Sequence, residues 1–332
     1  MRYRDVLKLS TPFRGVLILC LHRYCRHVGT SYASPSGKHK FGTCRYRHKI
    51  FIFGASRFGR QMRIQFASDL HLETRPKMTF RELLDPAAAP VLALLGDVAA
   101  LNDPNLRPFM EWCSEHWDTV LWIPGCLELL GPGSGNEGKR IPNLSAAVDR
   151  MRTIVEPYWN IMVLDHEGMV SDDGVYVFGL PFWKFPRDEA QIWQPQLYRY
   201  VNAEPSPMDP QYMAGLYNAD LEWLGDKLRG QHEPVLILSH YGPTTWLQEE
   251  TFLGDPDRSI MFPDIEQLLK HPVVGWICGH THKSVQTVKE WSDGTGSKGT
   301  IFMATNPKGR PYENLEFRKE GVVRIDPRLF RN

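Results

Sequence analysis

Acidic and imidazole side chains follow four separate apolar runs of this sequence, each at the point where the run ends. Carboxylate oxygens and imidazole nitrogens form the mixed ligand set that suits manganese, iron and zinc. Two such ions, held about 3.5 to 4 Å apart, polarise a phosphoryl group and generate hydroxide at neutral pH. The pattern therefore indicates a hydrolytic site with two metal ions. Its candidate ligands are Asp69 and His71 in "SDLH", Asp97 in "LLGDVA", His240 in "LSHYGP", and His280 and His282 in "GHTH".

The spacing within two of these pairs favours a shared centre. Residues i and i+2 of an extended segment point to the same side, so Asp69 with His71, and His280 with His282, can each face one centre. Glycine precedes Asp97 and His280, and glycine lets backbone and metal approach closely. A single Asp or His after a strand is usually a cap or a satisfied polar residue. Their joint occurrence at successive strand ends favours a metal site over coincidence.

The strands and helices that must position these side chains indicate an α/β fold. The early apolar runs are continuous and separated by helical patterns, which is typical of strands buried on both faces. In open α/β sheets, functional groups gather beyond the carboxyl ends of the strands. After residue 272 the strands follow one another without helices, which predicts a second, more antiparallel sheet. We expect strands at 63–68, 91–96, 119–123, 161–164, 175–180, 235–240, 273–279, 299–304 and 321–325, and helices at 79–84, 105–117, 143–155, 214–230 and 264–271.

Taken in order, these blocks resemble the calcineurin-like metallophosphoesterase family, whose motifs run D-x-H, G-D, G-N-H-[DE], a His after a strand, and G-H-x-H. The resemblance covers residues 62 to about 326 and implies a four-layer α/β/β/α sandwich with two mixed β-sheets. The tail "ATNPKGRPYENLEF" is also similar to the end of small single-domain members. The matching pieces are "DLH" (69–71), "GD" (96–97), "GCLE" (125–128), "SH" (239–240) and "GHTH" (279–282).

By this resemblance, the protein is a phosphoesterase with two divalent metal ions, Mn, Fe or Zn, that hydrolyses a phosphomonoester or phosphodiester by metal-bound hydroxide. The family's Asn ligand falls at Cys126, and its catalytic His, which assists the leaving group, falls at Leu127. No catalytic side chain is therefore carried over to this sequence. The implied ligands are Asp69, His71 and His282 for one ion, His240 and His280 for the other, with Cys126 at the Asn position and Asp97 as the bridge.

The departures at Cys126 and Leu127 leave alternatives open. A thiolate beside a dication is a competent ligand that would shift the preference toward zinc, whereas a buried spectator thiol would leave the second site weakened. Leu127 cannot transfer a proton, and a positioned general acid is typically worth about 10²- to 10⁴-fold in rate. We therefore expect attenuated turnover that favours aryl phosphates over alkyl phosphates. The alternative function is a catalytically inactive relative that acts as a metal-dependent binding module.

Residues 1–61 differ from the rest of the chain in charge and in pattern. They hold 13 Lys and Arg against one acid, whereas the remaining residues hold 26 against 37. We interpret this segment as a disordered or non-native extension, and Met62 as the start of the functional domain, 62–332. Other interpretations are an organelle transit peptide, a basic tether for nucleic acid or anionic membrane, and a zinc site. The zinc ligands would be Cys20, His22, Cys25 and His27.

Composition narrows the expected partners and compartment. Cys113, Cys126 and Cys278 lack paired spacing, which fits reduced thiols in the cytoplasm better than a disulfide framework. No apolar run is long enough to cross a bilayer, so we expect no membrane partner. The acidic body opposes polyanions, so nucleic acid is expected only as a substrate, and the main partner is a phosphate ester.

Residues outside the metal blocks carry weaker signals. Trp183 and Phe185, and the glycine-rich loop 131–140, are candidates to line a substrate cleft, with core packing and plain loop mobility as the alternatives. Substrate identity resides in such loops rather than in the metal blocks. The sequence leaves the substrate and the oligomeric state open.

Overall fold

The structure is a computed structural model that describes residues 61–131, 144–183, 198–201, 204–207, 210–244, 247, 265–292 and 296–326. Residues 1–60, with their four candidate zinc ligands, lie outside the described residues. So do Phe185 and nearly all of the glycine-rich loop, from 132 to 140.

The first sheet carries the strands that deliver the amino-terminal half of the predicted ligands. Its strand order is β13-β1-β2-β3-β4, in which β1 to β4 pair in parallel and β13 pairs antiparallel to β1. The carboxyl ends of the parallel strands therefore share one edge of the sheet. The strands are β1 (Met62–Ala67), β2 (Val91–Leu95), β3 (Thr119–Ile123), β4 (Ile161–Val163) and β13 (Val322–Ile325).

The second sheet delivers the remaining predicted ligands. Its order is β11-β12-β10-β9-β6-β5, with parallel pairs in the centre and an antiparallel strand at each edge. A separate antiparallel pair is formed by β7 (Tyr198–Val201) and β8 (Glu204–Pro207). The strands of the second sheet are β5 (Glu167–Val170), β6 (Tyr176–Leu180), β9 (Val235–Ser239), β10 (Val273–Cys278), β11 (Val285–Ser292) and β12 (Lys298–Thr305).

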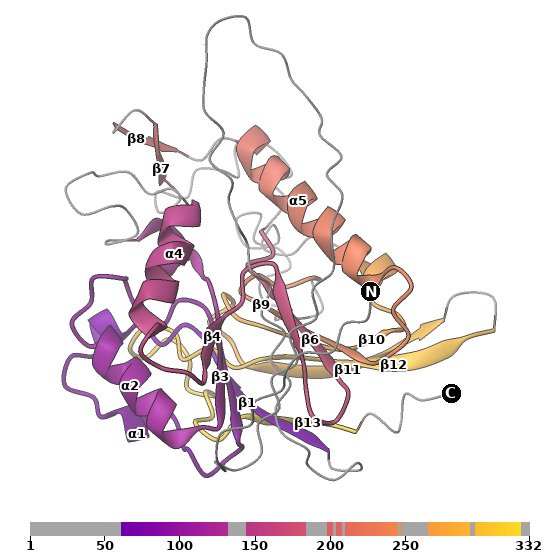
Figure 1. Cartoon of the computed structure of the whole chain (residues 1–332), viewed down its shortest axis with the longest axis horizontal. Coiled ribbons are helices and arrows are strands. Elements are labelled where there is room, and N and C mark those ends of the chain that lie inside the picture. The colour runs from indigo at the N-terminus through magenta and orange to yellow at the C-terminus, as the bar shows by residue number, and fades with distance from the viewer. Residues whose placement is uncertain are drawn as a thin grey trace, which may run out of the picture.

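Helices cover the outer face of each sheet. Figure 1 shows α1, α2 and α4 grouped on one side and α5 on the other. In α4 the buried residues Ala147, Val148, Met151 and Val155 recur at the helical period, so one face packs on the first sheet. The helices are α1 (Phe80–Leu83), α2 (Leu106–His116), α3 (Cys126–Leu130), α4 (Leu144–Val155) and α5 (Pro210–Leu228), with short 3₁₀ turns η1 (Leu72–Thr74) and η6 (Glu266–Leu268).

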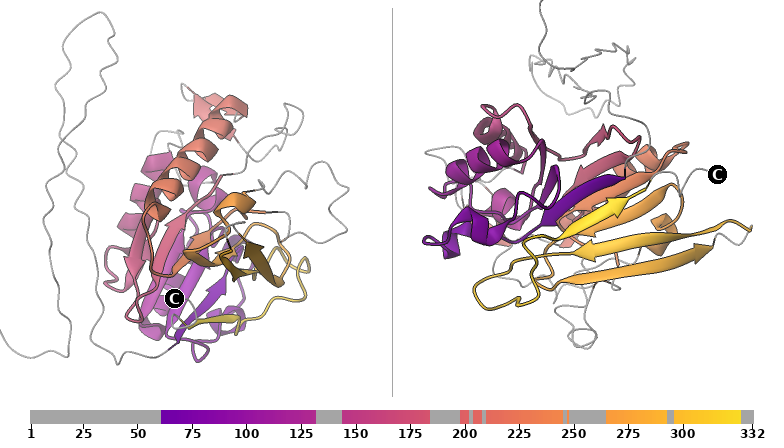
Figure 2. Two further views of the ribbon diagram at one scale, coloured as in Figure 1. Left: turned by 90° about the vertical axis from the view of Figure 1, so that its right-hand side faces the viewer. Right: turned by 90° about the horizontal axis from the view of Figure 1, so that it is seen from below.

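Alternation along buried strands separates three apolar cores. In β3, Val120 and Trp122 face the helices α2 and α4, whereas Leu121 and Ile123 face the second sheet. The strand β9 divides its side chains in the same way between the first sheet and α5. Three cores between successive layers make a four-layer α/β/β/α sandwich with two mixed sheets, as the family resemblance implies, and Figure 2 shows the layers from two further sides.

Some expectations about individual elements are wrong. The second, more antiparallel sheet predicted after residue 272 is found only in part: β11 and β12 pair antiparallel, but β10 pairs in parallel with β9 and β12, and β13 joins the first sheet. In the predicted helix 264–271 the described residues form only the 3₁₀ turn Glu266–Leu268, and Pro272 follows at once, so little chain is left for a helix. The strands β5 and β11 were not expected, since they lie at sheet edges with exposed residues.

Crossing a bilayer takes a long and apolar helix, and the described part of the chain contains none that qualifies. The three described cysteines, Cys113, Cys126 and Cys278, are free thiols.

Candidate metal centre

The ends of β1, β2, β9 and β10 are held together by main-chain hydrogen bonds. The Asp69 N–H donates to the Gly96 carbonyl over 2.9 Å, and the Gly279 N–H donates to the His240 carbonyl over 2.9 Å. Between the two sheets, His240 Nδ1 donates to the Leu95 carbonyl over 2.8 Å. All four predicted strand ends therefore meet at one place, where the two sheets face each other.

The backbone at these strand ends is left-handed and not extended. The described residues include eight non-glycine residues with positive φ, and five of them are predicted ligands. Asp and His tolerate this region better than most residues, and such conformations concentrate at functional sites. The five ligands are Asp69, His71, Asp97, His280 and His282.

His280 and His282 are two positions apart and were expected to face one centre, and this expectation is wrong. These two side chains do not face one centre, because each has a positive φ and the chain between them turns. His280 joins Asp97, Cys126 and His240, whereas His282 joins Asp69 and His71. This division is the one that the family resemblance implies.

The first donor group consists of Asp69, His71 and His282. His71 Nε2 and His282 Nε2 lie 3.4 Å apart, and His282 Nε2 lies 3.3 Å from Asp69 Oδ1. Asp69 and His71 are buried, and within the described residues Asp69 Oδ1 forms no hydrogen bond. A buried carboxylate oxygen without a donor is the kind of atom that a cation satisfies.

Carboxylates behind the two imidazoles fix their orientation. His71 Nδ1 lies 2.9 Å from Glu73 Oε1, and His282 Nδ1 lies 2.5 Å from Glu313 Oε2. A carboxylate on Nδ1 selects the tautomer whose Nε2 lone pair is available to a metal. Sequence reasoning missed both residues, although Glu73 is only two positions beyond His71.

The charges of the first donor group favour an ionised carboxylate. Burial alone would raise the pKa of Asp69, but the close contact with His282 and the charge of that imidazole hold it well below its ordinary value. Burial lowers the pKa of His282, but Asp69 and Glu313 outweigh it and raise this pKa to about 9. The Asp69 carboxylate is therefore ionised at neutral pH, and an ion that binds here would displace the His282 proton to reach the Nε2 lone pair.

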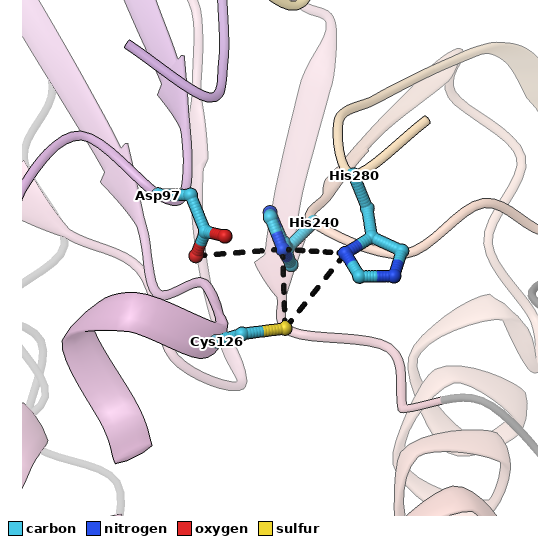
Figure 3. Close-up of side chains that lie close together, drawn as sticks. All are labelled: Asp97, Cys126, His240 and His280. Carbon is cyan, nitrogen blue, oxygen red and sulfur yellow. Dashed lines mark hydrogen bonds and ion pairs between the residues drawn. The ribbon is translucent and has the colours of Figure 1, made fainter. Parts of the chain in front are cut away.

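The second donor group consists of Asp97, Cys126, His240 and His280, which converge on one point in Figure 3. His240 Nε2 lies 3.2 Å from His280 Nδ1 and 3.6 Å from Asp97 Oδ1. Cys126 Sγ lies 3.5 Å from His240 Nε2 and 3.8 Å from His280 Nδ1. Burial and the Asp97 carboxylate raise the pKa of the Cys126 thiol.

Both groups fit a metal ion by chemistry and by spacing. In a tetrahedral site with metal–nitrogen and metal–oxygen bonds of about 2.0–2.2 Å and metal–sulfur bonds of about 2.3 Å, neighbouring donors lie about 3.3 to 3.6 Å apart. The separations in each group lie close to these values, and each group offers donor atoms within 4.8 Å of one another. The His280 N–H donates to Asp69 Oδ2 over 2.9 Å, so the two groups adjoin.

The block "GCLE" holds the centre through its backbone and through Glu128. The buried Glu128 carboxylate accepts from the N–H groups of Asp97 (2.9 Å), Val98 (2.8 Å) and Gly125 (3.0 Å). Burial and the neighbouring Asp97 raise the Glu128 pKa to about 7. The Leu127 N–H donates to Asp97 Oδ1 over 2.7 Å. The side chains at positions 126 and 127 differ from the family pattern. The hydrogen bonds to Glu128 and from the Leu127 N–H nevertheless hold both the backbone and the carboxylate of Asp97.

Glycine is required where this block crosses the end of β2. A Cβ atom on Gly96 would lie 2.5 Å from His240 Nδ1 and 2.6 Å from Gly125 Cα, and the φ of Gly96 is +80°. Any other residue at this position would push the His240 ring and the Gly125 backbone apart.

Tyr241 is a member of the site that sequence reasoning missed. Its hydroxyl lies 2.8 Å from Cys126 Sγ, and its buried ring packs on His280, with centroids 4.3 Å apart, and on Trp183, with centroids 5.7 Å apart. The only sequence signal is its position directly after His240. Trp183 is 3% exposed, so it packs in the core and does not line an open cleft.

No family model matches this chain. An uncharacterised protein of Acanthamoeba polyphaga mimivirus is 22% identical over 291 residues, which cover 81% of this chain and 99% of the viral protein. Among solved structures, a phosphopantetheinyl hydrolase from Mycobacterium tuberculosis superposes with a TM-score of 0.56 at 18% identity, covering 77% of this chain and 92% of the other. A dimetal phosphatase from Danio rerio has a TM-score of 0.41 at 13% identity, covering 81% and 99%.

The comparison with solved structures establishes the fold. The chain has the fold of the calcineurin-like metallophosphoesterases, so the resemblance seen in the sequence is confirmed at the level of the fold. Candidate metal-binding groups stand where the sequence motifs predict them.

Proposed function

We propose that this protein is a metal-dependent phosphoesterase that hydrolyses a phosphomonoester or a phosphodiester. The observation that carries the proposal is the pairing of two adjoining donor groups whose internal spacings suit metal ions. The metallophosphoesterase fold supports it, because both groups lie at the strand ends where this class of α/β fold gathers its chemistry.

The proposal assigns the donors to two divalent ions. Asp69, His71 and His282 would hold the first, His240 and His280 would hold the second, and Asp97 would lie between them. Bound there, divalent ions supply Lewis acidity toward the phosphoryl oxygens and lower the pKa of water.

The chain's own residues attract the cations, orient the imidazole ligands and limit the range of leaving groups. The buried carboxylates of Asp69 and Asp97 supply negative charge that draws cations into the centre. Hydrogen bonds to Glu73, Glu313 and the Leu95 carbonyl hold the imidazole rings in place before any ion binds. Leu127 offers no proton to a leaving group, so we expect a strong preference for esters of acidic alcohols.

The test is the hydrolysis of activated esters by the full-length protein. The protein is stripped with a chelator, reloaded with Mn²⁺, and assayed with p-nitrophenyl phosphate and bis(p-nitrophenyl) phosphate, which separate monoesterase from diesterase activity. We expect metal-dependent release of p-nitrophenol that Asp97→Asn lowers by at least about 100-fold, since ligand loss exceeds the cost of losing an outer support.

The matched control is Asp226→Asn, the same change at an exposed carboxylate of α5 that pairs with Arg229. It should leave turnover unchanged. Protein that binds two ions per chain and gives no turnover above buffer would refute the enzymatic proposal and favour the metal-dependent binding module.

A further inference from the structure

We propose that Cys126 makes the second donor group a thiolate-containing site, so that the two groups of this centre prefer different metals. The first group would take an ion that favours oxygen and nitrogen donors, such as Mn²⁺. The second would take a thiophilic ion such as Zn²⁺. The inference rests on the proposed function only in requiring that both groups bind metal.

The position of the sulfur sets Cys126 apart from the other described cysteines. Cys113 and Cys278 are buried among apolar side chains in the helix-facing cores. Cys126 Sγ instead lies 3.5 Å from His240 Nε2 and 3.8 Å from His280 Nδ1, close to the sulfur–nitrogen separation of about 3.6 Å in a tetrahedral zinc site. A spectator thiol has no reason to converge with two imidazoles in this way.

The donor sets of the two groups differ in kind. Asp69, His71 and His282 offer one oxygen and two nitrogens, whereas the second group adds sulfur to one oxygen and two nitrogens. Thiolate selects zinc and other soft ions over manganese, which prefers oxygen donors. A thiol that coordinates a dication loses its proton on binding, so the sulfur adds a full negative charge to the second site.

Tyr241 completes the environment of this sulfur. Its hydroxyl is 2.8 Å from Sγ, and a thiolate can only accept, so the tyrosine O–H becomes the donor once metal is bound. Its ring is fixed by packing against His280 and Trp183. Tyr241 is thus a positioning residue, which holds the sulfur and lowers the energy of its lone pairs.

The experiment is cobalt substitution of the full-length protein carrying Cys20→Ser and Cys25→Ser, so that the alternative zinc ligands of residues 1–61 contribute no sulfur. Co²⁺ replaces zinc and reports its ligands by absorption, and this double variant serves as the wild type with respect to Cys126. We expect the cobalt-loaded wild type to show a near-ultraviolet sulfur-to-cobalt charge-transfer band together with visible d–d bands. Cys126→Asn should remove the charge-transfer band and keep d–d absorption. Cys113→Ala, the matched control, should keep both. Tyr241→Phe should keep the charge-transfer band but move it to lower energy, a change that mere loss of packing does not produce.

Metal competition gives a second readout. The ratio of Cd²⁺ to Mn²⁺ retained by the second site should fall by at least about tenfold in Cys126→Asn, since even an outer support is worth about 10- to 100-fold in affinity. Cys113→Ala should retain the wild-type ratio.

The outcomes separate this inference from the proposed function. A wild-type protein that binds two ions and hydrolyses aryl phosphates without any charge-transfer band overturns the role of Cys126 alone. A charge-transfer band that persists in Cys126→Asn likewise overturns the role of Cys126 alone. A protein that binds no ion at all overturns both proposals. If Cys126→Asn fails to fold, the spectrum of the wild type still decides.

Discussion

The block "GCLE" (125–128) has two roles in this site: it holds Asp97 in place, and it places residues 126 and 127 beside the metal centre. The structural task is intact, because Glu128 and the Leu127 N–H hold Asp97 in place. The chemical task has changed, because Cys126 stands where the family pattern has Asn and Leu127 stands where it has His. At the scale of single residues, the site is preorganised for metal but lacks a proton donor at position 127.

Leu127→His should restore what this position lacks. Its backbone is already anchored to Asp97 Oδ1, so the new imidazole needs no rearrangement of the loop. We expect kcat for an alkyl phosphate to rise by about 10²-fold or more, with little change for p-nitrophenyl phosphate, whose leaving group needs no proton. The ratio of the two rates measures the effect.

Leu127→Asn is the control for polarity without proton transfer. It should leave the alkyl-to-aryl ratio near that of the wild type. An equal rise for His and Asn would contradict the role assigned to this position.

Glu128→Gln tests the support of the centre. The amide would place N–H groups against three backbone donors that now share the two carboxylate oxygens. We expect metal affinity to fall by about 10- to 100-fold and the free energy of unfolding to fall by about 1 to 3 kcal/mol. Calorimetric titration with Mn²⁺ and urea unfolding measure the two losses, and unchanged affinity would argue that the carboxylate does not position Asp97.

The predictable residues of this site are those with a motif spacing. The six Asp and His donors follow apolar runs, so their residue type and their position at a predicted strand end together identify them as candidate ligands. Tyr241 and Glu313 carry no such signal, because their roles depend on contacts to Cys126 and His282 that the chain makes only after folding. The left-handed backbone of His280 was also beyond prediction, since Asp and His reach this conformation through tertiary support.

The same contrast holds for elements. Strands buried on both faces, such as β3 and β9, are continuous apolar runs and were predicted to within a residue. The edge strand β11 has apolar residues only at Val285, Val288 and Trp291, which is not the period of a strand, and α3 is only five residues long, so neither was predicted. Short elements are defined by their partners, not by their own periodicity.

The helix α5 is tied to the strands by a polar contact at His166. This imidazole lies between β4 and β5, with Nδ1 at 3.0 Å from Asp165 Oδ1 and Nε2 at 2.5 Å from Asp220 Oδ1 on α5. Asp220 also accepts from the Trp183 N–H over 2.6 Å. Burial lowers the pKa of His166, but the two carboxylates outweigh it and raise the pKa to about 10.

Because its pKa is raised in the folded state, His166 stabilises the fold when it is protonated, at low pH. The contribution is complete below the unfolded-state pKa of about 6.5 and is lost as pH rises through about 10. We expect His166→Gln to lower the free energy of unfolding by on the order of 1 kcal/mol at pH 6, with the difference from wild type shrinking toward pH 10. Urea unfolding across this range measures it. His232→Gln, at an exposed histidine, should show no such trend.

At the scale of the whole molecule, each donor group joins the two sheets. Asp69 and His71 follow β1 of the first sheet, whereas their partner His282 follows β10 of the second. The second group likewise joins Asp97 and Cys126 to His240 and His280. An ion in either group would therefore cross-link the sheets at their carboxyl edges, where the core between the sheets ends.

Metal binding should consequently stabilise the whole sandwich. An ion that binds only the folded state adds about 2.7 kcal/mol at a free concentration of 100 Kd, or about 5 °C or more in Tm for a domain of this size. Scanning calorimetry of the stripped and Mn²⁺-loaded protein measures the shift. His282→Ala should remove about half of it by disabling the first group, whereas Asp226→Asn should keep it whole. Equal Tm values with and without metal would show that the two groups do not cross-link the sheets.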